Sequence, residues 1–209
     1  NGLKNLKINK KKYLYLISPN IINISFYNDL IKVLKSKKVS FFQLRLKKDS
    51  LKNKIKIGKK IKIICQKYQV KFIINDDPLL AKIINADGCH LGQKDMNIYN
   101  ARKLLKKKII GITCHNSLRL AKLAIKNKAD YVAFGAFNSS KTKRVKYKAN
   151  ISLIKKLKKL SNIPVVAIGG INNLNYKKLL LNKADFLAIS GYIWGNKKLK
   201  PLETIKKLK

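Results

Sequence analysis

Acidic side chains are scarce in this chain of 209 residues, yet four of them lie close together. The sequence has nine Asp plus Glu against 49 Lys plus Arg, and residues 72–95, FIINDDPLLAKIINADGCHLGQKD, hold Asp76, Asp77, Asp87 and Asp95. Carboxylates from separate segments, with an Asn beside them, suit Mg²⁺, a hard cation that takes one or two carboxylates with water and phosphate oxygens. The segment therefore predicts a site for Mg²⁺ and a phosphorylated ligand.

Eight short apolar runs divide the chain, and stretches with helical spacing lie between them. Each run has the length and the aromatic or β-branched content of a strand that is buried on both faces. The predicted strands lie at 13–17, 39–45, 70–75, 87–91, 109–113, 130–135, 163–169 and 185–190. The apolar stripes of two predicted helices are Leu51, Ile55, Ile61, Cys65 and Tyr68, and Ile151, Ile154, Leu157 and Leu160.

The alternation of strands and helices predicts the fold class. Eight strands alternating with helices in a chain of this length indicate a parallel sheet, and eight such units close into a (β/α)8 barrel. An open doubly wound sheet is the alternative, but no Gly-x-Gly-x-x-Gly follows the first predicted strand. No linker or compositional break divides the chain. We therefore predict an α/β protein with one domain, a (β/α)8 TIM barrel over residues 1–209, in which residues 1–12 form a basic leader.

Composition excludes several classes of protein. A hydrophobic content of 46% is enough to fill one core. The apolar runs are far shorter than the roughly 18 residues of a membrane span, and no cleavage site follows the basic N-terminal segment. Three cysteines without Cys-x-x-Cys spacing argue against a disulfide framework or a zinc site. We therefore predict a soluble protein of the reducing cytoplasm, with no membrane partner.

A formal net charge of +40 raises the question of a nucleic-acid partner, because Lys and Arg supply most non-specific binding to phosphates. Only four of the 49 cationic residues are Arg, although Arg is suited to bidentate recognition of bases and phosphates. The lysines are spread over the whole chain among many Asn and Ile, residues that A/T-rich codons encode. We therefore attribute the charge to compositional drift and solvated helix faces, and expect no nucleic-acid partner.

A barrel would place the acidic residues on two different rims. Active sites of this fold lie where the strands end and the βα loops begin. Asp76, Asp77 and Asp95 follow predicted strands and should converge there, whereas Asp87 opens a strand at the opposite rim. For Asp77 an alternative stays open, because it could cap the next helix with Pro78 in the first turn.

Cations and hydroxyl groups at the same rim predict two phosphate sites. Arg45, Lys47 and Lys143 would neutralise a diphosphate that is bound with Mg²⁺. Gly169 and Gly170 lie at the end of the predicted strand 163–169, and Ser190 and Gly191 lie at the end of 185–190. These are the positions where many barrels hold a phosphate on backbone N–H groups. Two phosphate sites on one rim suggest an enzyme that joins two phosphorylated substrates. The second predicted site comprises Ser140, Thr142, Gly169, Gly170, Ser190 and Gly191.

The motifs, in order along the chain, resemble those of the thiamine-phosphate synthase family. They are QLRLK at 43–47, INDD at 74–77, DGCHLGQKD at 87–95, GITCH at 111–115, DYVAFGAFNSSKTK at 130–143, PVVAIGGI at 164–171 and AIS at 188–190. The resemblance implies a (β/α)8 fold, Mg²⁺ as cofactor and small phosphorylated substrates. It implies a transferase that joins 4-amino-2-methyl-5-hydroxymethylpyrimidine diphosphate to a (carboxy)thiazole ethyl phosphate. Diphosphate would leave first, and the thiazole nitrogen would capture a pyrimidine methyl cation.

The resemblance also implies a role for each matching residue. The pyrimidine diphosphate would be held by Gln43, Arg45, Lys47, Asn75, Thr113 and Lys143, of which Thr113, Lys143 and Arg45 would be catalytic. The metal ligands would be Asp76 and Asp95. The thiazole phosphate would be held by Ser140, Thr142, Gly170, Ile189 and Ser190.

The chain departs from the family pattern at three positions. Leu46 stands where the family often has Glu, Thr113 where Ser is common, and Ser139 where Pro is usual. Thr113 keeps the hydroxyl group, and Leu46 should point away from its neighbours on the strand. We interpret His90 and His115 as structural, and Gln93 either orients Asp95 or closes a turn.

Two other functions remain open at this point. One is a thiazole tautomerase-like paralogue, which does not join the two substrates and lacks the metal and diphosphate residues. The other is a basic nucleic-acid-binding protein on a barrel whose catalysis has decayed. Retention of the whole rim set favours the synthase. The sequence leaves open whether the chain forms a homo-oligomer.

Overall fold

The computed structural model describes residues 12–139 and 146–209. Eight parallel strands follow one another in chain order around a closed barrel, and the last pairs with the first. The strands are β1 (Leu14–Ile17), β2 (Val39–Leu44), β3 (Lys71–Asn75), β4 (Gly88–Leu91), β5 (Ile109–Thr113), β6 (Tyr131–Gly135), β7 (Val165–Ile168) and β8 (Phe186–Ile189). The predicted (β/α)8 barrel is confirmed, and each strand lies inside the apolar run predicted for it. Of the predicted leader, only Lys12 is among the described residues.

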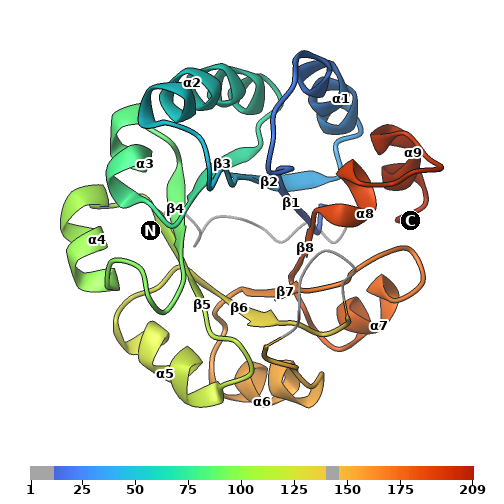
Figure 1. The fold of residues 1–209 in the computed structure, drawn as a ribbon. Coiled ribbons are helices and arrows are strands. Elements are labelled where there is room, and N and C mark those ends of the chain that lie inside the picture. The colour runs from blue at the N-terminus through green and yellow to red at the C-terminus, as the bar shows by residue number, and fades with distance from the viewer. Residues whose placement is uncertain (1–11, 140–145) are drawn as a thin grey trace.

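Helices surround the barrel, as the view along its axis shows (Figure 1). They are α1 (Ile24–Lys35), α2 (Leu51–Lys67), α3 (Pro78–Ile84), α4 (Ile98–Leu105), α5 (Leu118–Lys126), α6 (Ser152–Leu160), α7 (Tyr176–Leu181), α8 (Gly191–Trp194) and α9 (Pro201–Lys206). The starts of α1 to α5 are fixed by N-caps, because Asn23, Ser50, Asp77, Asn97 and Ser117 each accept a backbone hydrogen bond from three residues on. Within the described ranges, every helix falls short of what a membrane span requires.

Two layers of apolar side chains hold the barrel together. Tyr15, Phe41, Tyr131 and Phe186 belong to the layer that fills the barrel interior. The second and larger layer lies between the strands and the helices. Successive residues of a strand point to opposite faces, so each strand contributes to both layers. Leu46 belongs to the outer layer, as predicted.

The two predicted apolar stripes are correct for the central residues of each helix, but each includes one terminal residue that is exposed. Ile61 of α2 and Ile154 of α6 are fully buried, but Leu51 is 56% exposed and Leu160 is 60% exposed. Leu51 is the first residue of α2 and Leu160 is the last residue of α6. A terminal residue has helical neighbours on one side only, which explains the poor cover.

Three Asp side chains join neighbouring strands at the amino end of the barrel. Asp87, Asp130 and Asp185 directly precede β4, β6 and β8. Their Oδ2 atoms accept hydrogen bonds of 2.7, 2.8 and 2.7 Å from the backbone N–H groups of Phe72, Ile110 and Val165. Each carboxylate thus accepts from a backbone N–H group near the start of the preceding strand, where the neighbouring strand no longer offers a carbonyl group. Asp87 lies at the rim opposite the predicted site, as expected.

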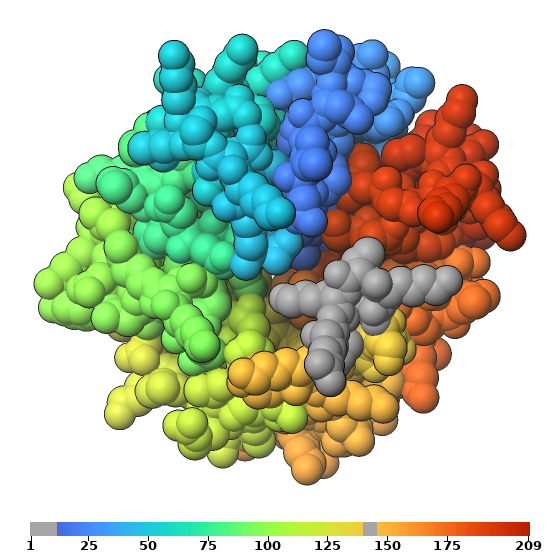
Figure 2. Space-filling model, viewed as in Figure 1, coloured from blue at the N-terminus to red at the C-terminus, as the bar shows by residue number. Residues whose placement is uncertain are grey.

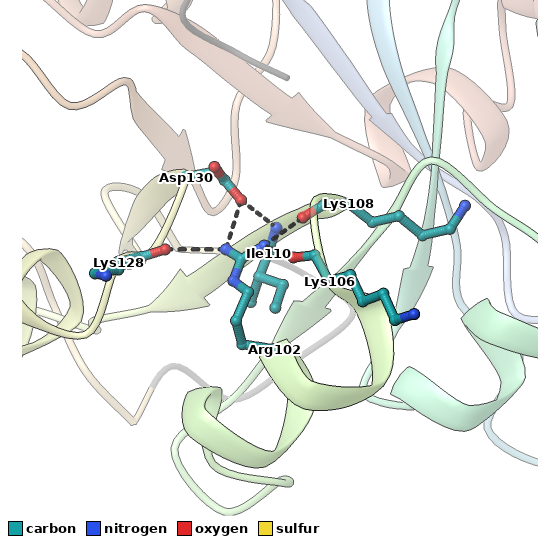
Figure 3. A network of polar contacts seen from close by, with 6 residues as sticks. All are labelled: Arg102, Lys106, Lys108, Ile110, Lys128 and Asp130. Atoms are coloured by element: carbon teal, nitrogen blue, oxygen red, sulfur yellow. Dashed lines mark hydrogen bonds and ion pairs between the residues drawn. The ribbon is translucent and has the colours of Figure 1, made fainter. Parts of the chain in front are cut away.

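Arg102 of α4 ties one of these junctions to two loops (Figure 3). Its guanidinium group donates to Asp130 at 2.9 Å, and to the carbonyl oxygens of Lys106, Lys108 and Lys128 at 2.8, 2.6 and 2.9 Å. A guanidinium group carries five donors in a rigid plane, whereas an ammonium group carries three on a flexible stem. Arg102 therefore serves a structural purpose that the abundant lysines could not.

Replacing Arg102 should destabilise the fold. The Arg102→Met substitution removes the donor to three carbonyl oxygens and leaves the half-buried Asp130 carboxylate with the N–H of Ile110 but without its cation. We expect the free energy of unfolding, measured by urea denaturation, to fall by about 2–3 kcal/mol. The matched control is Arg119→Met at an exposed position of α5, where we expect a change within about 0.5 kcal/mol. Equal losses in the two variants would contradict this role of Arg102.

Candidate active site

The polar residues predicted for the site lie at the carboxyl end of the barrel. Asn75 and Thr113 are the last residues of β3 and β5, Arg45 and Lys47 follow β2, and Asp95 follows β4. Because all strands are parallel, these positions share one rim. Figure 2, viewed as Figure 1, shows that both halves of the chain, blue to green and yellow to red, reach the barrel axis. The fold therefore gathers the predicted residues at one end.

Asp76 and Asp95 form a pair of facing carboxylates. Asp76 has a φ of 65°, a left-handed conformation, and its backbone N–H donates to the carbonyl oxygen of His90 at 2.8 Å. Asp95 is held in a turn, where its Oδ2 accepts a 2.6 Å hydrogen bond from the backbone N–H of Gly92. A left-handed backbone at a non-glycine residue is uncommon, and most other examples among the described residues lie where a helix ends, whereas Asp76 follows a strand. The two βα loops are therefore shaped to bring these carboxylates together.

The environment of Asp76 favours a cation between the two carboxyl groups. Burial raises the pKa of Asp76 above its usual range, and the hydrogen bond and charge of Asp95 raise it further. Lys47, whose Nζ lies 3.8 Å from Oδ2 of Asp76, and the side chain of Asn75 oppose this shift. Crowded carboxylates are what a bound cation relieves. The donor set therefore fits Mg²⁺, which accepts one or two carboxylates.

Asp77 does not belong to this pair. Its Oδ1 accepts a 2.9 Å hydrogen bond from the backbone N–H of Leu80 and caps α3, with Pro78 in the first turn. The capping alternative is thus correct, and Asp77 still lies at the expected rim, because it lines a cavity together with Asp76. Residues 12–139 and 146–209 contain no group of three or more His, Cys, Asp or Glu that could hold a metal. A cation here needs further oxygen ligands from phosphate or water.

A cavity of about 300 Å³ opens beside the carboxylate pair, between the loops that follow β2 and β3. Lys47, Asn75 and Asp76 line it together with Lys54 of α2. The sequence-based interpretation missed Lys54. Its place in the first turn of α2 is the signal that could have found it, because a helix that follows a barrel strand starts at the rim. Asp77 and apolar side chains of the outer layer line the rest of this cavity, namely Leu44, Leu46, Ile74 and Leu80.

Arg45 is anchored at the neighbouring edge of the site. Its backbone N–H donates to the hydroxyl oxygen of Ser18 at 2.9 Å, and its guanidinium Nη1 donates to Oδ1 of Asn20 at 3.1 Å. The loop after β1 therefore fixes where this cation stands. Lys143, the third predicted cation, lies outside the described residues, as do Ser140 and Thr142.

A hydrogen-bonded chain crosses the barrel interior and ends at two predicted site residues. The amide Nε2 of Gln43 donates to the Tyr15 hydroxyl at 2.8 Å, and the hydroxyl oxygens of Tyr15 and Tyr131 lie 2.7 Å apart. The Tyr131 hydroxyl lies 2.8 Å from Nδ1 of His90, whose Nε2 lies 2.7 Å from Oγ1 of Thr113. Burial lowers the pKa of His90 to about 4, although the charge of Asp95 opposes the shift. The imidazole is therefore neutral at pH 7.

Gln93 lies inside the turn in which the backbone N–H of Asp95 donates to the carbonyl oxygen of Gly92 at 3.3 Å, in agreement with the turn alternative. Its amide Nε2 donates to the backbone carbonyl of Thr113 at 2.7 Å and so links the loop after β4 to the end of β5. His115 is a structural residue as predicted, because its ring stacks on Tyr147 with the centroids 4.1 Å apart. Sequence reasoning assigned no role to Tyr15 or Tyr131, since aromatic residues in strands are usually packing residues.

The predicted thiazole-phosphate site has a tightly built backbone. Gly169 and Gly170 have φ values of 108° and 56°, and a Cβ on Gly170 would lie 2.5 Å from the carbonyl oxygen of Ser139. The amide groups of Asn138 and Asn175 donate to the carbonyl oxygens of Gly169 and Gly170 at 3.3 and 2.8 Å. Glycine is therefore required at both positions.

The end of β8 completes this side of the rim. The Ser190 hydroxyl donates to the backbone carbonyl of Ser18 at 3.3 Å, which joins the ends of β8 and β1. The side chain of Ile189 is buried in the outer apolar layer. Of Ile189, only the backbone can therefore reach a ligand on the barrel axis.

The sequence and the fold of this chain are similar to those of known proteins. A family model described as thiamine monophosphate synthase matches residues 14–193. The chain is 68% identical to a thiamine-phosphate synthase of Pelagibacter ubique, covering 99% of this chain and 100% of that protein. It is 42% identical to a protein of the same name from Nitrosomonas eutropha, over 87% and 86% of the two chains. The solved thiamine phosphate pyrophosphorylase of Pyrococcus furiosus superposes with a TM-score of 0.83 at 27% identity, over 95% and 94%.

Because the pKa of Asp76 is raised, we expect the free energy of unfolding of the metal-free protein to fall as the pH rises and Asp76 ionises. A carboxyl group whose pKa is higher in the folded protein than in the unfolded chain makes its full contribution to stability at pH values below its pKa in the unfolded chain. That contribution is lost as the pH rises through its pKa in the folded protein. With EDTA, Asp76→Asn should match the wild type in free energy of unfolding below pH 3.8, the ordinary aspartate pKa, and exceed it at pH 7. Chemical denaturation at several pH values measures this.

The control for the pH series is Asp29→Asn in α1, which makes the same change in net charge. It should not reproduce the gain at pH 7. A metal-free Asp76→Asn variant that is no more stable than the wild type at pH 7 would contradict the crowding of the two carboxylates.

Proposed function

Because the chain belongs to the thiamine monophosphate synthase family, we propose that it joins a pyrimidine diphosphate to a thiazole phosphate, with Mg²⁺ as cofactor. The substrates would be 4-amino-2-methyl-5-hydroxymethylpyrimidine diphosphate and a (carboxy)thiazole ethyl phosphate. The products would be thiamine phosphate and diphosphate. The facing pair of Asp76 and Asp95 is the observation that carries the proposal, since it fits a cation that must share its ligands with a phosphate.

The diphosphate would lie over the cavity next to Asp76. Asp76 and Asp95 would hold Mg²⁺, which supplies charge neutralisation at the departing diphosphate. Lys47 and Asn75 line this cavity and would donate to phosphate oxygens, and Lys54 extends the same basic wall. Arg45, fixed by Ser18 and Asn20, would reach the diphosphate from the β2 side. In this arrangement the cations of the site would stand where negative charge develops.

The proposed bond changes are those that the family resemblance implies. The bond between the pyrimidine methylene carbon and the diphosphate oxygen breaks, and its electron pair leaves with the diphosphate. The pyrimidine methyl cation that remains is captured by the lone pair of the thiazole nitrogen, which forms the new carbon–nitrogen bond. Gln43 and Thr113 would hold the pyrimidine ring, while Lys143 would act on the leaving diphosphate as the family resemblance implies. Besides this electrostatic stabilisation, the positioning of the two reactants would supply much of the rate enhancement.

The thiazole phosphate would be held on the opposite side of the rim. Gly170 and the backbone of Ile189 would donate N–H groups to its phosphate, and Ser190 would add a hydroxyl group. Ser140 and Thr142 are proposed for the same phosphate from the family resemblance alone. This places the two phosphorylated groups apart, with the two rings between them over the barrel axis.

Two observations bear on the other predictions. Retention of Asp76, Asp95 and the lysines Lys47 and Lys54 beside Asp76 disfavours a tautomerase-like paralogue, which does not need a metal or a diphosphate site. The cysteines Cys65, Cys89 and Cys114 are free and buried, which supports a reducing compartment such as the cytoplasm. The absence of a nucleic-acid partner stays a prediction, which rests on the spread of the lysines over the whole chain.

Product formation tests the proposal. Purified protein with both substrates should form thiamine phosphate in Mg²⁺ and none in EDTA. Asp76→Asn should lower the rate about 100-fold or more, because each 1.4 kcal/mol of lost charge stabilisation costs a factor of about ten. The control Lys155→Glu, on the exposed face of α6, should leave the rate nearly unchanged. Near-normal Mg²⁺-dependent turnover in Asp76→Asn would remove this assignment of the metal site.

A further inference from the structure

The hydrogen-bonded chain across the barrel is unusual because the rest of the interior is apolar. Phe41, Ile73 and Phe186 pack beside it without polar partners. Buried polar groups are costly unless each is satisfied, and a satisfied network fixes its members in one arrangement. A chain that joins Gln43 on β2 to Thr113 on β5 therefore calls for a reason beyond filling the barrel.

The direction of each hydrogen bond follows from counting donors. The Gln43 nitrogen can only donate, so the Tyr15 oxygen accepts from it. Tyr15 is buried, and the only other partner of its hydroxyl among the described residues is Tyr131. Tyr15 must therefore donate its own proton to the Tyr131 oxygen.

Counting donors in the same way gives the direction of the remaining hydrogen bonds, up to Thr113. Tyr131 accepts from Tyr15, so it donates to Nδ1 of His90. A neutral imidazole that accepts at Nδ1 carries its proton on Nε2, which then donates to Oγ1 of Thr113. The Thr113 proton is not needed inside the chain. It remains free to point out of the barrel.

The two ends of the chain face outward with opposite polarity. Gln43 is buried near the carboxyl end of β2, and its Nε2 is turned toward Tyr15. The amide oxygen Oε1 is therefore the atom of Gln43 that can accept from a ligand, and Thr113 has a proton to donate.

We propose that Tyr15, Tyr131 and His90 are positioning residues that fix Gln43 as a hydrogen-bond acceptor and Thr113 as a hydrogen-bond donor toward the substrate ring. The consequence for specificity rests on the proposed function. A pyrimidine with an exocyclic amino group offers a donor and a ring nitrogen offers an acceptor, which match the two ends of the chain. An oxo group in place of the amino group would meet the Gln43 oxygen acceptor to acceptor and be rejected.

The tautomer of His90 tests the direction of the chain without any substrate. The protein has two histidines, so ¹⁵N-histidine labelling gives two sets of signals. A His115→Gln variant assigns them. We expect His90 at pH 7 to carry its proton on Nε2, with Nδ1 unprotonated. A His90 that carries the proton on Nδ1 would overturn the proposal, because the chain would then run the other way.

A pair of Tyr→Phe variants tests the effect on specificity. Tyr131→Phe keeps the ring but breaks the chain between Tyr15 and His90. We expect its kcat/KM for the aminopyrimidine diphosphate to fall about tenfold, and its preference over the oxo analogue to fall by a similar factor. The control Tyr13→Phe removes a buried hydroxyl of the outer layer and should change neither quantity.

The outcomes separate the two levels of the proposal. If the two variants behave alike in kcat/KM and in preference, the positioning role is overturned even if the wild-type enzyme is active. If the wild type forms no product, the proposed function fails, while the tautomer of His90 still decides the direction of the chain.

Discussion

Closure of eight parallel strands into one ring forces every strand to end at the same rim, and the rest of the molecule follows from that constraint. At the amino rim, carboxylates join neighbouring strands, because Asp87, Asp130 and Asp185 each accept a hydrogen bond from the preceding strand. The carboxyl rim carries the crowded carboxylates of Asp76 and Asp95 and the glycines with positive φ, Gly169 and Gly170. Left-handed residues occur at both rims, so the crowded carboxylates are the feature that distinguishes the carboxyl rim.

The few acidic residues explain how a chain with a net charge of +40 keeps a defined fold. Nearly every carboxylate has a specific partner: three join strands, Asp77 and Glu203 act at helix starts, and Asp76 and Asp95 face each other at the rim. The lysines are mostly spread over helix faces, where solvent screens them and single changes matter little. A rare residue type in such a chain is therefore more informative than an abundant one.

The strands were predictable because each is buried on both faces and so reads as an unbroken apolar run. Arg45, Asn75, Asp76 and Asp95 were predictable as rim residues because they are polar residues placed where such runs stop. Tyr15 and Tyr131 were not, since an aromatic residue in a strand shows nothing of which hydroxyl groups meet across the barrel. The partner of Gln93 and the approach of Lys54 also depend on how neighbouring loops pack, which spacing along the chain does not encode.

The central claim is that Asp76 and Asp95 create a site where a diphosphate binds through a shared Mg²⁺ ion. Calorimetric titration of inorganic diphosphate into the protein, in Mg²⁺ and again in EDTA, tests it most directly. The account predicts one site whose affinity falls at least about tenfold without the metal, a difference of about 1.4 kcal/mol or more. Equal affinity in both conditions would contradict it, because the lysines alone would then account for the binding.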